Sequence, residues 1–197
     1  MQVTRITQYY SRRFRAAMQI YRVEFPDTAF PTSRTRALLK AGSYQLLVAE
    51  DESGVLAMAL VWVCRRPTFL HLDYIAVRKE EKGRGIGTAL YRWLIDHLQE
   101  LAPGARLLTL EVDDELLGFY RRSSTKVLQN VPYMFPAQQG PLPLNLMVHD
   151  RLGRKTLNRA LVQAIIRGLY RGIHNRGSDD ALLCSFIARV PRQVVLV

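Results

Sequence analysis

The segment Val77 to Leu90, VRKEEKGRGIGTAL, decides the fold because it joins an apolar run to a helical pattern through three glycines. Glycines allow a phosphate to approach the backbone closely. The first amides of a helix have no partner within the helix and can bind an anion. The segment therefore predicts the end of a strand, a turn that cradles a pyrophosphate, and the start of a helix.

Two other phosphate-binding motifs do not match this turn. A dinucleotide-binding fingerprint that begins at Gly83 needs glycine or alanine at Thr88, and one that begins at Gly85 needs it at Leu90. The nearest strand-end carboxylate, Glu111, comes later than the ~20 residues that this fingerprint requires. A Walker loop needs Gly-Lys-Ser/Thr, which the sequence lacks. The ligand must therefore be identified from the spacing of the glycines.

Apolar periodicity and turn residues predict the elements on either side of the turn. Before it we expect helices at Gln8–Glu24 and Arg34–Ala41, a hairpin of strands Tyr44–Glu50 and Val55–Cys64, and a strand at Thr68–Val77. After it we expect a helix at Gly85–Leu101, a strand at Leu107–Val112, a short helix at Leu116–Arg122, a long stiffened loop at Gln129–Leu146, a strand at Leu144–Val148 and an amphipathic helix from Leu157 to Ile173. The fold class is therefore α/β (α+β), with a mixed, mostly antiparallel twisted sheet flanked by helices.

Length and composition fit one globular domain with an extension. The 197 residues are 48% hydrophobic, enough for one sizeable core. We place the domain at residues 1–150 and a basic helical C-terminal extension at residues 151–197. Cys64 and Cys184 stand far apart, so we expect two buried small hydrophobes rather than a disulfide framework or a zinc site. The sequence has no apolar signal region and no stretch near the ~18 apolar residues of a membrane span, so we expect a cytoplasmic location.

Written as V-x-x-x-x-[R/Q]-x-x-G-x-[G/A], the stretch Val77 to Gly87 resembles the coenzyme A motif of the GNAT superfamily of N-acetyltransferases. Lys82 stands where the family usually has arginine or glutamine, which keeps the positive charge but loses the planar fork. The resemblance extends from about Tyr44 to Leu128 and includes Leu110-Glu111-Val112, which looks like the family's L-E-V segment. The resemblance implies a GNAT-like fold.

The same resemblance implies acetyl-coenzyme A as cosubstrate, with no metal. In the family, the strand before the turn pairs with the pantetheine arm, and the turn binds the pyrophosphate. The residues at the matching positions are Ile75, Ala76, Val77, Lys82, Gly83, Arg84, Gly85, Ile86, Gly87 and Thr88. After Phe119 to Arg122, which is similar to the family's L-Y-x-[KR] segment, the family commonly continues x-G-F, whereas this chain has Ser123 to Lys126. This departure concerns the rim of the cofactor site.

Acetyl transfer needs a neutral amine, a stabilised oxyanion and a proton for the leaving thiolate. Tyr120 matches the family's tyrosine near the thioester sulfur, whose phenol protonates the thiolate. His71 and Asp73 stand two apart on one strand, point to one face, and match positions where family members place a base or a water-holding residue. His71 is the expected base because its ordinary pKa is ~6.5, while Asp73 suits holding the ammonium. The structural alternatives are a half-buried tyrosine for Tyr120 and a solvated or hydrogen-bonded strand pair for His71 and Asp73, and Glu111 is a weaker candidate.

The sequence thus predicts an acetyl-CoA-dependent N-acetyltransferase that acts on an amine of a small molecule or peptide by direct transfer in a ternary complex. The formal net charge of +11 favours an acidic or phosphorylated acceptor. Two alternatives stay open: a longer-chain N-acyltransferase, and a GNAT-fold regulatory or nucleic-acid-binding protein. The nucleic-acid contact of the latter would consist of Arg154, Lys155, Arg159, Arg167, Arg171 and Arg176. Salt-dependent binding of RNA or DNA would distinguish that protein from the enzyme.

Overall fold

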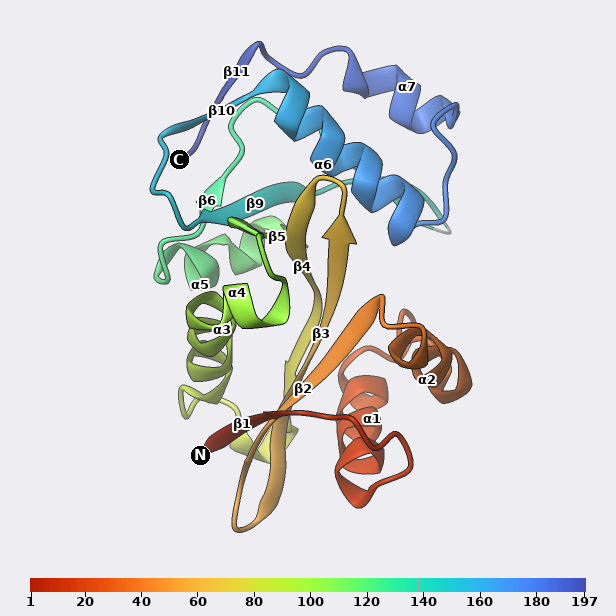
Figure 1. Cartoon of the computed structure of the whole chain (residues 1–197), viewed down its shortest axis with the longest axis vertical. Coiled ribbons are helices and arrows are strands. Elements are labelled where there is room, and N and C mark those ends of the chain that lie inside the picture. Colours follow the sequence, from red (N-terminus) through yellow and green to blue (C-terminus); the bar gives the residue numbers. More distant parts are fainter. Residues whose placement is uncertain (138) are drawn as a thin grey trace. The chain divides into compact units, whose positions relative to one another are not determined.

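The computed structural model describes residues 1–137 and 139–197, and these residues form two compact units. Unit 1 consists of Met1–Val63 and Leu72–His97, and unit 2 consists of Cys64–His71 and Leu98–Val197. Figure 1 labels most of their helices and strands. The expected division into residues 1–150 and 151–197 does not coincide with these units and stays a prediction.

The sheet of unit 1 has the strand order β1-β2-β3-β4. These strands span Gln2–Arg5, Tyr44–Asp51, Gly54–Arg65 and Thr68–Val77, and the last two each contribute residues to both units. Strand β2 pairs antiparallel with β1 and with β3, and Asp51 pairs with Gly54 at the tight turn of the hairpin. Every residue of β2 except Asp51 is buried, as in a strand that is covered on both faces. The expected hairpin and the strand Thr68–Val77 are confirmed, whereas β1 was not predicted.

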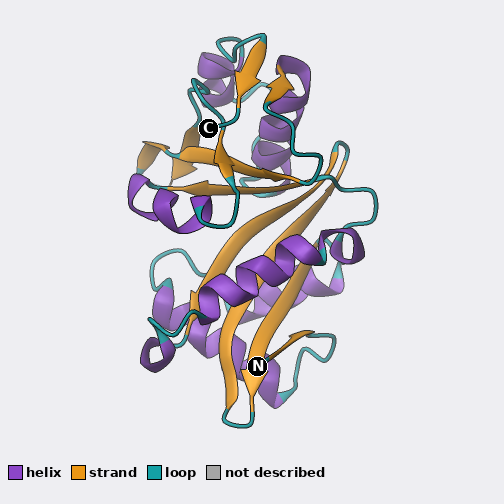
Figure 2. Ribbon diagram, turned by 90° about the vertical axis from the view of Figure 1, so that its left-hand side faces the viewer, coloured by secondary structure: helices purple, strands orange, loops and turns teal. Residues whose placement is uncertain are grey.

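Helices cover both faces of this sheet. Helices α1 (Arg12–Glu24) and α2 (Thr32–Lys40) lie on one face, and α3 (Ile86–Asp96) lies on the other (Figures 1 and 2). A short 3₁₀ helix, η1 (Lys79–Glu81), precedes the glycine turn. Helix α1 begins later than predicted because the Ser11 side chain accepts a hydrogen bond from the Phe14 amide and caps it there.

The sheet of unit 2 is built around β5 (Leu107–Val112), β9 (Asn145–Asp150) and β6 (Lys126–Val127), which pair in that order, all antiparallel. Short helices α4 (Leu98–Leu101), η2 (Asp114–Leu116) and α5 (Leu117–Arg121) connect these strands to the rest of the chain. The predicted helix Gly85–Leu101 is divided, because α3 ends at the cap residue His97 and α4 follows as a separate turn.

The C-terminal part of unit 2 contains more strand than predicted. Helices α6 (Arg159–Gly172) and α7 (Ala181–Ile187) are accompanied by the strand pair β10 (Thr156–Asn158) and β11 (Gln193–Val195). The extension is therefore not purely helical. Asn158 accepts a hydrogen bond from the Leu161 amide and sets the start of α6, later than predicted. Cys184 on α7 is exposed, contrary to expectation, whereas Cys64 is buried.

The segment that was expected to be a loop contains the hairpin of β7 (Met134–Ala137) and β8 (Gly140–Pro143). Its prolines suggested a loop because proline cannot donate to a central strand. In a two-stranded sheet both strands are edges, so the prolines leave no interior hydrogen bond unmade. In unit 2, α6 and α5 lie on opposite faces of the β5-β9-β6 sheet (Figure 1). The expected fold class, a mostly antiparallel sheet flanked by helices, is confirmed.

Candidate functional site

The glycine turn of unit 1 has the geometry of an anion cradle. Gly83 and Gly85 have φ angles of 79° and 78°, in the left-handed region that favours glycine. Gly85 is the N-cap of α3, and within the described residues no side chain caps this helix. The first amides of α3, from Ile86 onward, lack partners within the helix by its geometry. These amides are available to an anionic ligand.

Carboxylates hold the cations around this turn. Lys82 pairs with Glu24 on α1, and Glu81 pairs with both Arg78, at 3.1 Å, and Arg84. The predicted residues from Lys82 to Thr88 therefore lie together on one turn, with their positive charges partly neutralised. Because the Lys82 and Arg84 side chains of these ion pairs are largely exposed, each of the two pairs contributes little to stability. A phosphate can compete for the same side chains.

Asp73 of unit 1 lies beside an aromatic cluster. The Tyr44 hydroxyl donates a hydrogen bond to Asp73 Oδ2 at 2.8 Å. Burial, reinforced by the Asp73 charge, raises the pKa of Tyr44 well above its ordinary value, so the phenol stays protonated. The cluster is completed by ring contacts among Tyr21, Phe25, Phe30, Tyr44 and Tyr74. No motif pointed to Tyr44, because its partner lies 29 residues away.

A buried polar network occupies the core of unit 2. His71 Nδ1 lies 2.9 Å from Thr109 Oγ1, and His71 Nε2 lies 3.9 Å from Glu111 Oε2. Glu111 Oε1 accepts a hydrogen bond from the Tyr133 hydroxyl and lies 3.1 Å from His174 Nε2. The side chains of His71, Glu111 and His174 are 1%, 7% and 6% exposed. The network thus joins His71, which was predicted as catalytic, to Glu111, which was the weaker candidate. Its other three members, Thr109, Tyr133 and His174, were not predicted as catalytic.

The network fixes the charge states of its members. Burial lowers the pKa of His71 to about 4, although the Glu111 charge acts in the opposite direction, so the imidazole is neutral at neutral pH. Burial raises the pKa of Glu111, but the hydrogen bond and charge of His174, the His71 charge and the Tyr133 hydroxyl together lower it below its ordinary value of 4.5. At neutral pH a neutral imidazole therefore faces a carboxylate.

Tyr133 and His174 were missed because neither belongs to a motif. Tyr133 precedes β7, and His174 follows α6. The 63-residue separation between Glu111 and His174 leaves no local signal in the sequence. His71 and Tyr120, which were predicted, both lie in unit 2, and Asp73 and the glycine turn lie in unit 1.

Tyr120 lies on α5 and is 5% exposed. Burial raises its pKa above the ordinary value, and the Asp113 charge adds to this effect. Its ring contacts Phe119 with a centroid separation of 4.9 Å. The phenol is therefore protonated at neutral pH and is able to donate a proton.

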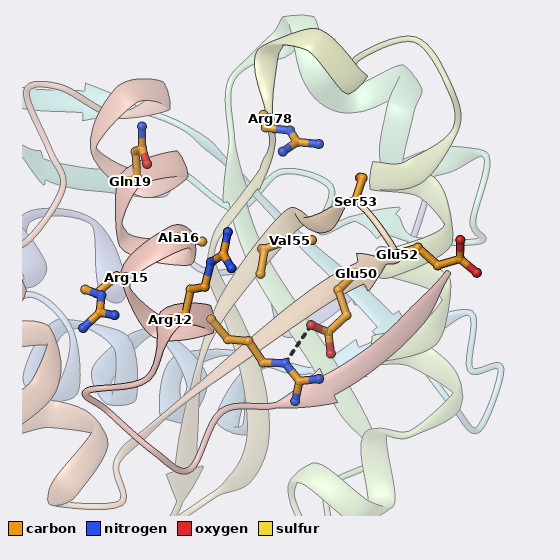
Figure 3. A pocket seen from close by; sticks show the side chains of 11 residues that line it. Arg12, Arg15, Ala16, Gln19, Glu50, Glu52, Ser53, Val55 and Arg78 are labelled. Atoms are coloured by element: carbon orange, nitrogen blue, oxygen red, sulfur yellow. Dashed lines mark ion pairs between the residues drawn. The ribbon is translucent and has the colours of Figure 1, made fainter.

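An arginine-rich cleft lies on unit 1, between α1 and the turn that joins β2 to β3 (Figure 3). Its volume is about 630 Å³. The lining includes four arginines, Arg12, Arg13, Arg15 and Arg78, and two glutamates, Glu50 and Glu52.

The described residues contain neither a cluster of potential metal ligands nor a helix that could span a membrane. Across residues 1–137 and 139–197, no group of three or more His, Cys, Asp or Glu side chains could hold a metal ion. In the same residues, no helix combines the length and the apolar character that crossing a membrane requires.

A sequence-family match covers the glycine turn and the predicted catalytic residues, but not Tyr133 or His174. A model of the acetyltransferase (GNAT) family matches residues 9–123, which include the glycine turn, His71, Asp73, Glu111 and Tyr120. A stretch of 113 residues is 30% identical to an uncharacterized protein of Dictyostelium discoideum and covers 56% of this chain and 25% of that protein. The match thus spans only a quarter of that curated relative.

Several solved structures share the fold. A putative acetyltransferase from the GNAT family from Bacteroides thetaiotaomicron aligns with a TM-score of 0.68 and 18% identity over 87% of this chain and 97% of that one. The ribosomal-protein-S18-alanine N-acetyltransferase from Escherichia coli aligns with 0.55 and 22% identity over 76% and 92%. An aminoglycoside 6'-N-acetyltransferase complexed with coenzyme A aligns with 0.62 and 13% identity over 78% and 99%. At these identities the likeness establishes the fold alone.

Proposed function

The chain belongs to the GNAT acetyltransferase family, and from this premise we propose that it transfers an acetyl group from acetyl-coenzyme A to an amine of a small molecule or peptide. The transfer is direct, within a ternary complex. The observation that carries this proposal is the uncapped N-terminus of α3 behind two left-handed glycines, at the position of the family's coenzyme A motif.

The glycine turn fits the pyrophosphate of the cofactor. A side chain carbon added at Gly83 or Gly85 would meet no atom within 4 Å, so the space beside both glycines is open. The amides at the start of α3 and the positive end of the helix dipole stabilise an anion there. Ile75, Ala76 and Val77, at the end of β4, are proposed to pair with the pantetheine arm, and Lys82, Arg84 and Thr88 to line the phosphates.

Acetyl-coenzyme A supplies the thioester, whose carbonyl carbon forms a bond to the amine nitrogen as the bond to sulfur breaks. Tyr120 is proposed to donate its phenolic proton to the departing thiolate. Because its pKa is raised, Tyr120 is protonated at neutral pH, so its phenol can donate a hydrogen bond and then its proton to the sulfur as negative charge develops there. The structural alternative for Tyr120, a half-buried packing residue, predicts that its hydroxyl is dispensable.

His71 is proposed to take up the proton that the amine loses. Its neutral imidazole supports this, because only that form accepts a proton. With 1% of its side chain exposed, His71 is suited to accept the proton through a water molecule rather than by touching the amine. The Glu111 carboxylate, 3.9 Å from Nε2, would stabilise the imidazolium that forms. Tyr133 and His174 hold that carboxylate in place.

Asp73 is proposed to hold the ammonium form of the acceptor before it loses its proton. Its hydrogen bond from Tyr44 supports this role by orienting the carboxylate within an aromatic cluster, and aromatic faces attract ammonium groups. The formal net charge of +11 favours acceptors that also carry an acidic group. The acceptor class is therefore an amine that bears an anionic substituent.

The nucleic-acid alternative receives little support from its arginines. Arg154 pairs with Asp150 at 2.6 Å, and Arg176 pairs with Asp180 at 3.3 Å. Carboxylates of the protein thus already neutralise two of the six cations proposed for that surface.

Thermal unfolding with acetyl-CoA tests the cofactor assignment. At a concentration about 100 times its Kd, the ligand should stabilise the protein by about 2.7 kcal/mol, which raises Tm by about 5–10 °C for a chain of this size. Gly85→Glu should abolish this rise by placing a carboxylate at the anion site. Gly42→Glu is the matched control, because Gly42 has a φ of 73° and equally open surroundings but follows Ala41, the C-cap of α2. Equal shifts in both folded variants would contradict the assignment.

A further inference from the structure

The arginine cleft is one part of a longer groove along α1. A second hollow of about 270 Å³ shares Ala16, Gln19, Val55 and Arg78 with it and continues toward the C-terminal end of the helix. The shared residues Ala16 and Val55 give the groove an apolar floor. Positions Arg12, Ala16, Gln19 and Val23 follow the spacing of one helix face. One stripe of α1 therefore lines the whole groove.

The N-terminus of α1 carries an electrostatic cost in the free protein. Its first turn holds Arg12, Arg13 and Arg15 and no carboxylate. The N-terminal end of a helix is its positive end, where acidic residues stabilise and basic residues do not. Such an unfavourable cluster of basic residues at a helix N-terminus is typical of a functional site, because a bound anionic ligand offsets its electrostatic cost.

The protein offsets this charge only in part. Arg13 Nε pairs with Glu50 Oε2 at 2.8 Å, the dashed line in Figure 3, and Arg78 pairs with Glu81 outside the cleft. Among residues 1–137 and 139–197, no ion pair neutralises Arg12. Figure 3 shows the Arg12 guanidinium reaching toward Val55, whereas Arg15 points away from the cleft. Arg12 is thus a cation without a protein partner above an apolar floor.

Arg78 adds a second donor on the far side of the cleft. Its Nε is buried and has no hydrogen-bond partner among the described residues. A buried donor left without a partner is costly. A small rotation of this side chain toward an anion in the cleft would satisfy the donor. The cleft therefore has arginines from two separate places in the chain, the start of α1 and Arg78, the residue after β4.

We propose that this cleft binds the phosphate group of a phosphorylated small molecule, at a site separate from the glycine turn. The planar fork of arginine matches phosphate oxygens and forms charge-assisted hydrogen bonds with them. The volume of about 630 Å³ lies in the range of small-molecule sites. Of the described residues that line the two hollows, none belongs to the turn from Lys82 to Thr88. The apolar floor would hold the non-phosphate part of the ligand.

Two sources could provide such a ligand: the acceptor of the transfer reaction, or an effector that is not acetylated. The recognising chemistry is the same for both. The proposal of this site does not depend on the proposed activity, because the site is inferred from the charge and shape of unit 1 alone.

Calorimetric titration with inorganic pyrophosphate tests the proposal. The protein is first saturated with coenzyme A, so that pyrophosphate cannot occupy the glycine turn. We expect pyrophosphate binding to weaken as the salt concentration rises. The substitution Arg12→Gln should weaken it at least about tenfold, since a charge-assisted contact is lost. Arg22→Gln is the control, because Arg22 is exposed on the same helix and lines neither hollow. Its affinity should equal that of the unmodified protein.

Three results would overturn the proposal. In the first, pyrophosphate would not bind in the presence of coenzyme A. In the second, Arg12→Gln and Arg22→Gln would weaken pyrophosphate binding equally. In the third, Arg12→Gln would reduce the affinity for coenzyme A as much as the affinity for pyrophosphate. The last would assign the arginines to the cofactor site. Failure of acetyl-CoA to bind would instead contradict the proposed function, and the titration without coenzyme A would still test the cleft through the difference between Arg12→Gln and Arg22→Gln. If pyrophosphate binds and inhibits acetyl transfer in competition with the acceptor, the phosphate group that the cleft recognises belongs to the acceptor. Binding without such competition identifies an effector.

Discussion

Replacing Tyr133 with phenylalanine removes one hydroxyl from the buried network and leaves the ring in place. The Tyr133 side chain lies in the core at 2% exposure, and its hydroxyl donates to Glu111. A hydrogen bond to a charged group contributes about 1.5–3 kcal/mol. Because His174 still lies 3.1 Å from the same carboxylate oxygen, we expect a loss of about 2 kcal/mol at pH 7. For a chain of this size, that loss lowers Tm by about 4–8 °C.

The pH dependence of this loss identifies its cause. The pKa of Glu111 is lower in the folded protein than its ordinary value of 4.5, so its contribution to stability is complete above that value. The contribution is lost as the pH falls through the lower, folded pKa. Without the Tyr133 hydroxyl the folded pKa rises, so the difference between Tyr133→Phe and the unmodified protein should be constant from pH 7 to about 5.5 and shrink below 4.5.

Urea unfolding at a series of pH values measures this difference. Tyr170→Phe is the matched control, because the Tyr170 hydroxyl donates to the neutral backbone carbonyl of Met134 in the same unit. Its loss should be about 1 kcal/mol and nearly independent of pH. A Tyr133→Phe loss below about 0.5 kcal/mol, or one that stays constant down to pH 3.5, would refute the interpretation of Glu111 as a carboxylate held by hydrogen bonds.

Three further substitutions test the proposed roles. Tyr120→Phe should lower kcat by at least about tenfold while acetyl-CoA affinity is kept, since only the phenolic proton is lost, and unchanged turnover would make Tyr120 structural. His71→Gln should lower kcat. Because the pKa of His71 is about 4, the activity of the unmodified protein should fall as the pH drops toward 4, and the substitution should remove this fall. An unaltered pH profile would exclude His71 as the base. Asp73→Asn should mainly raise the acceptor's KM, so a changed kcat with constant KM would contradict its role in holding the ammonium.

The core of the fold could be predicted because its signals are local. The turn Asp51 to Gly54 lies between two apolar runs and predicts the hairpin, although an irregularity between Ala49 and Glu50 shifts the register that the turn sets. The glycines at residues 83 and 85 predict a turn between a strand and a helix, and the structure has β4 before them and α3 after them. Helix limits were less accurate where the cap is a single side chain, as at Ser11 and Asn158.

The parts that escaped prediction depend on contacts between distant residues. Tyr133 and Glu111 are separated by 22 positions, and His174 and Glu111 by 63, so no window of sequence contains the network. The prolines of residues 132–143 indicated a loop, although two edge strands tolerate them. His71 could be predicted as a candidate from its strand position, but its burial could not, because Thr109 and Glu111 come from another strand.

Amine-dependent release of coenzyme A tests the central claim most directly. The protein is incubated with acetyl-CoA and pools of amines, with and without acidic substituents, while free thiol is followed and acetylated products are identified by mass. We predict thiol release that requires an amine, that is greatest for amines bearing an anionic group, and that is lost in Gly85→Glu but kept in Gly42→Glu. Binding of acetyl-CoA without amine-dependent thiol release from any pool would contradict the proposed acetyl transfer.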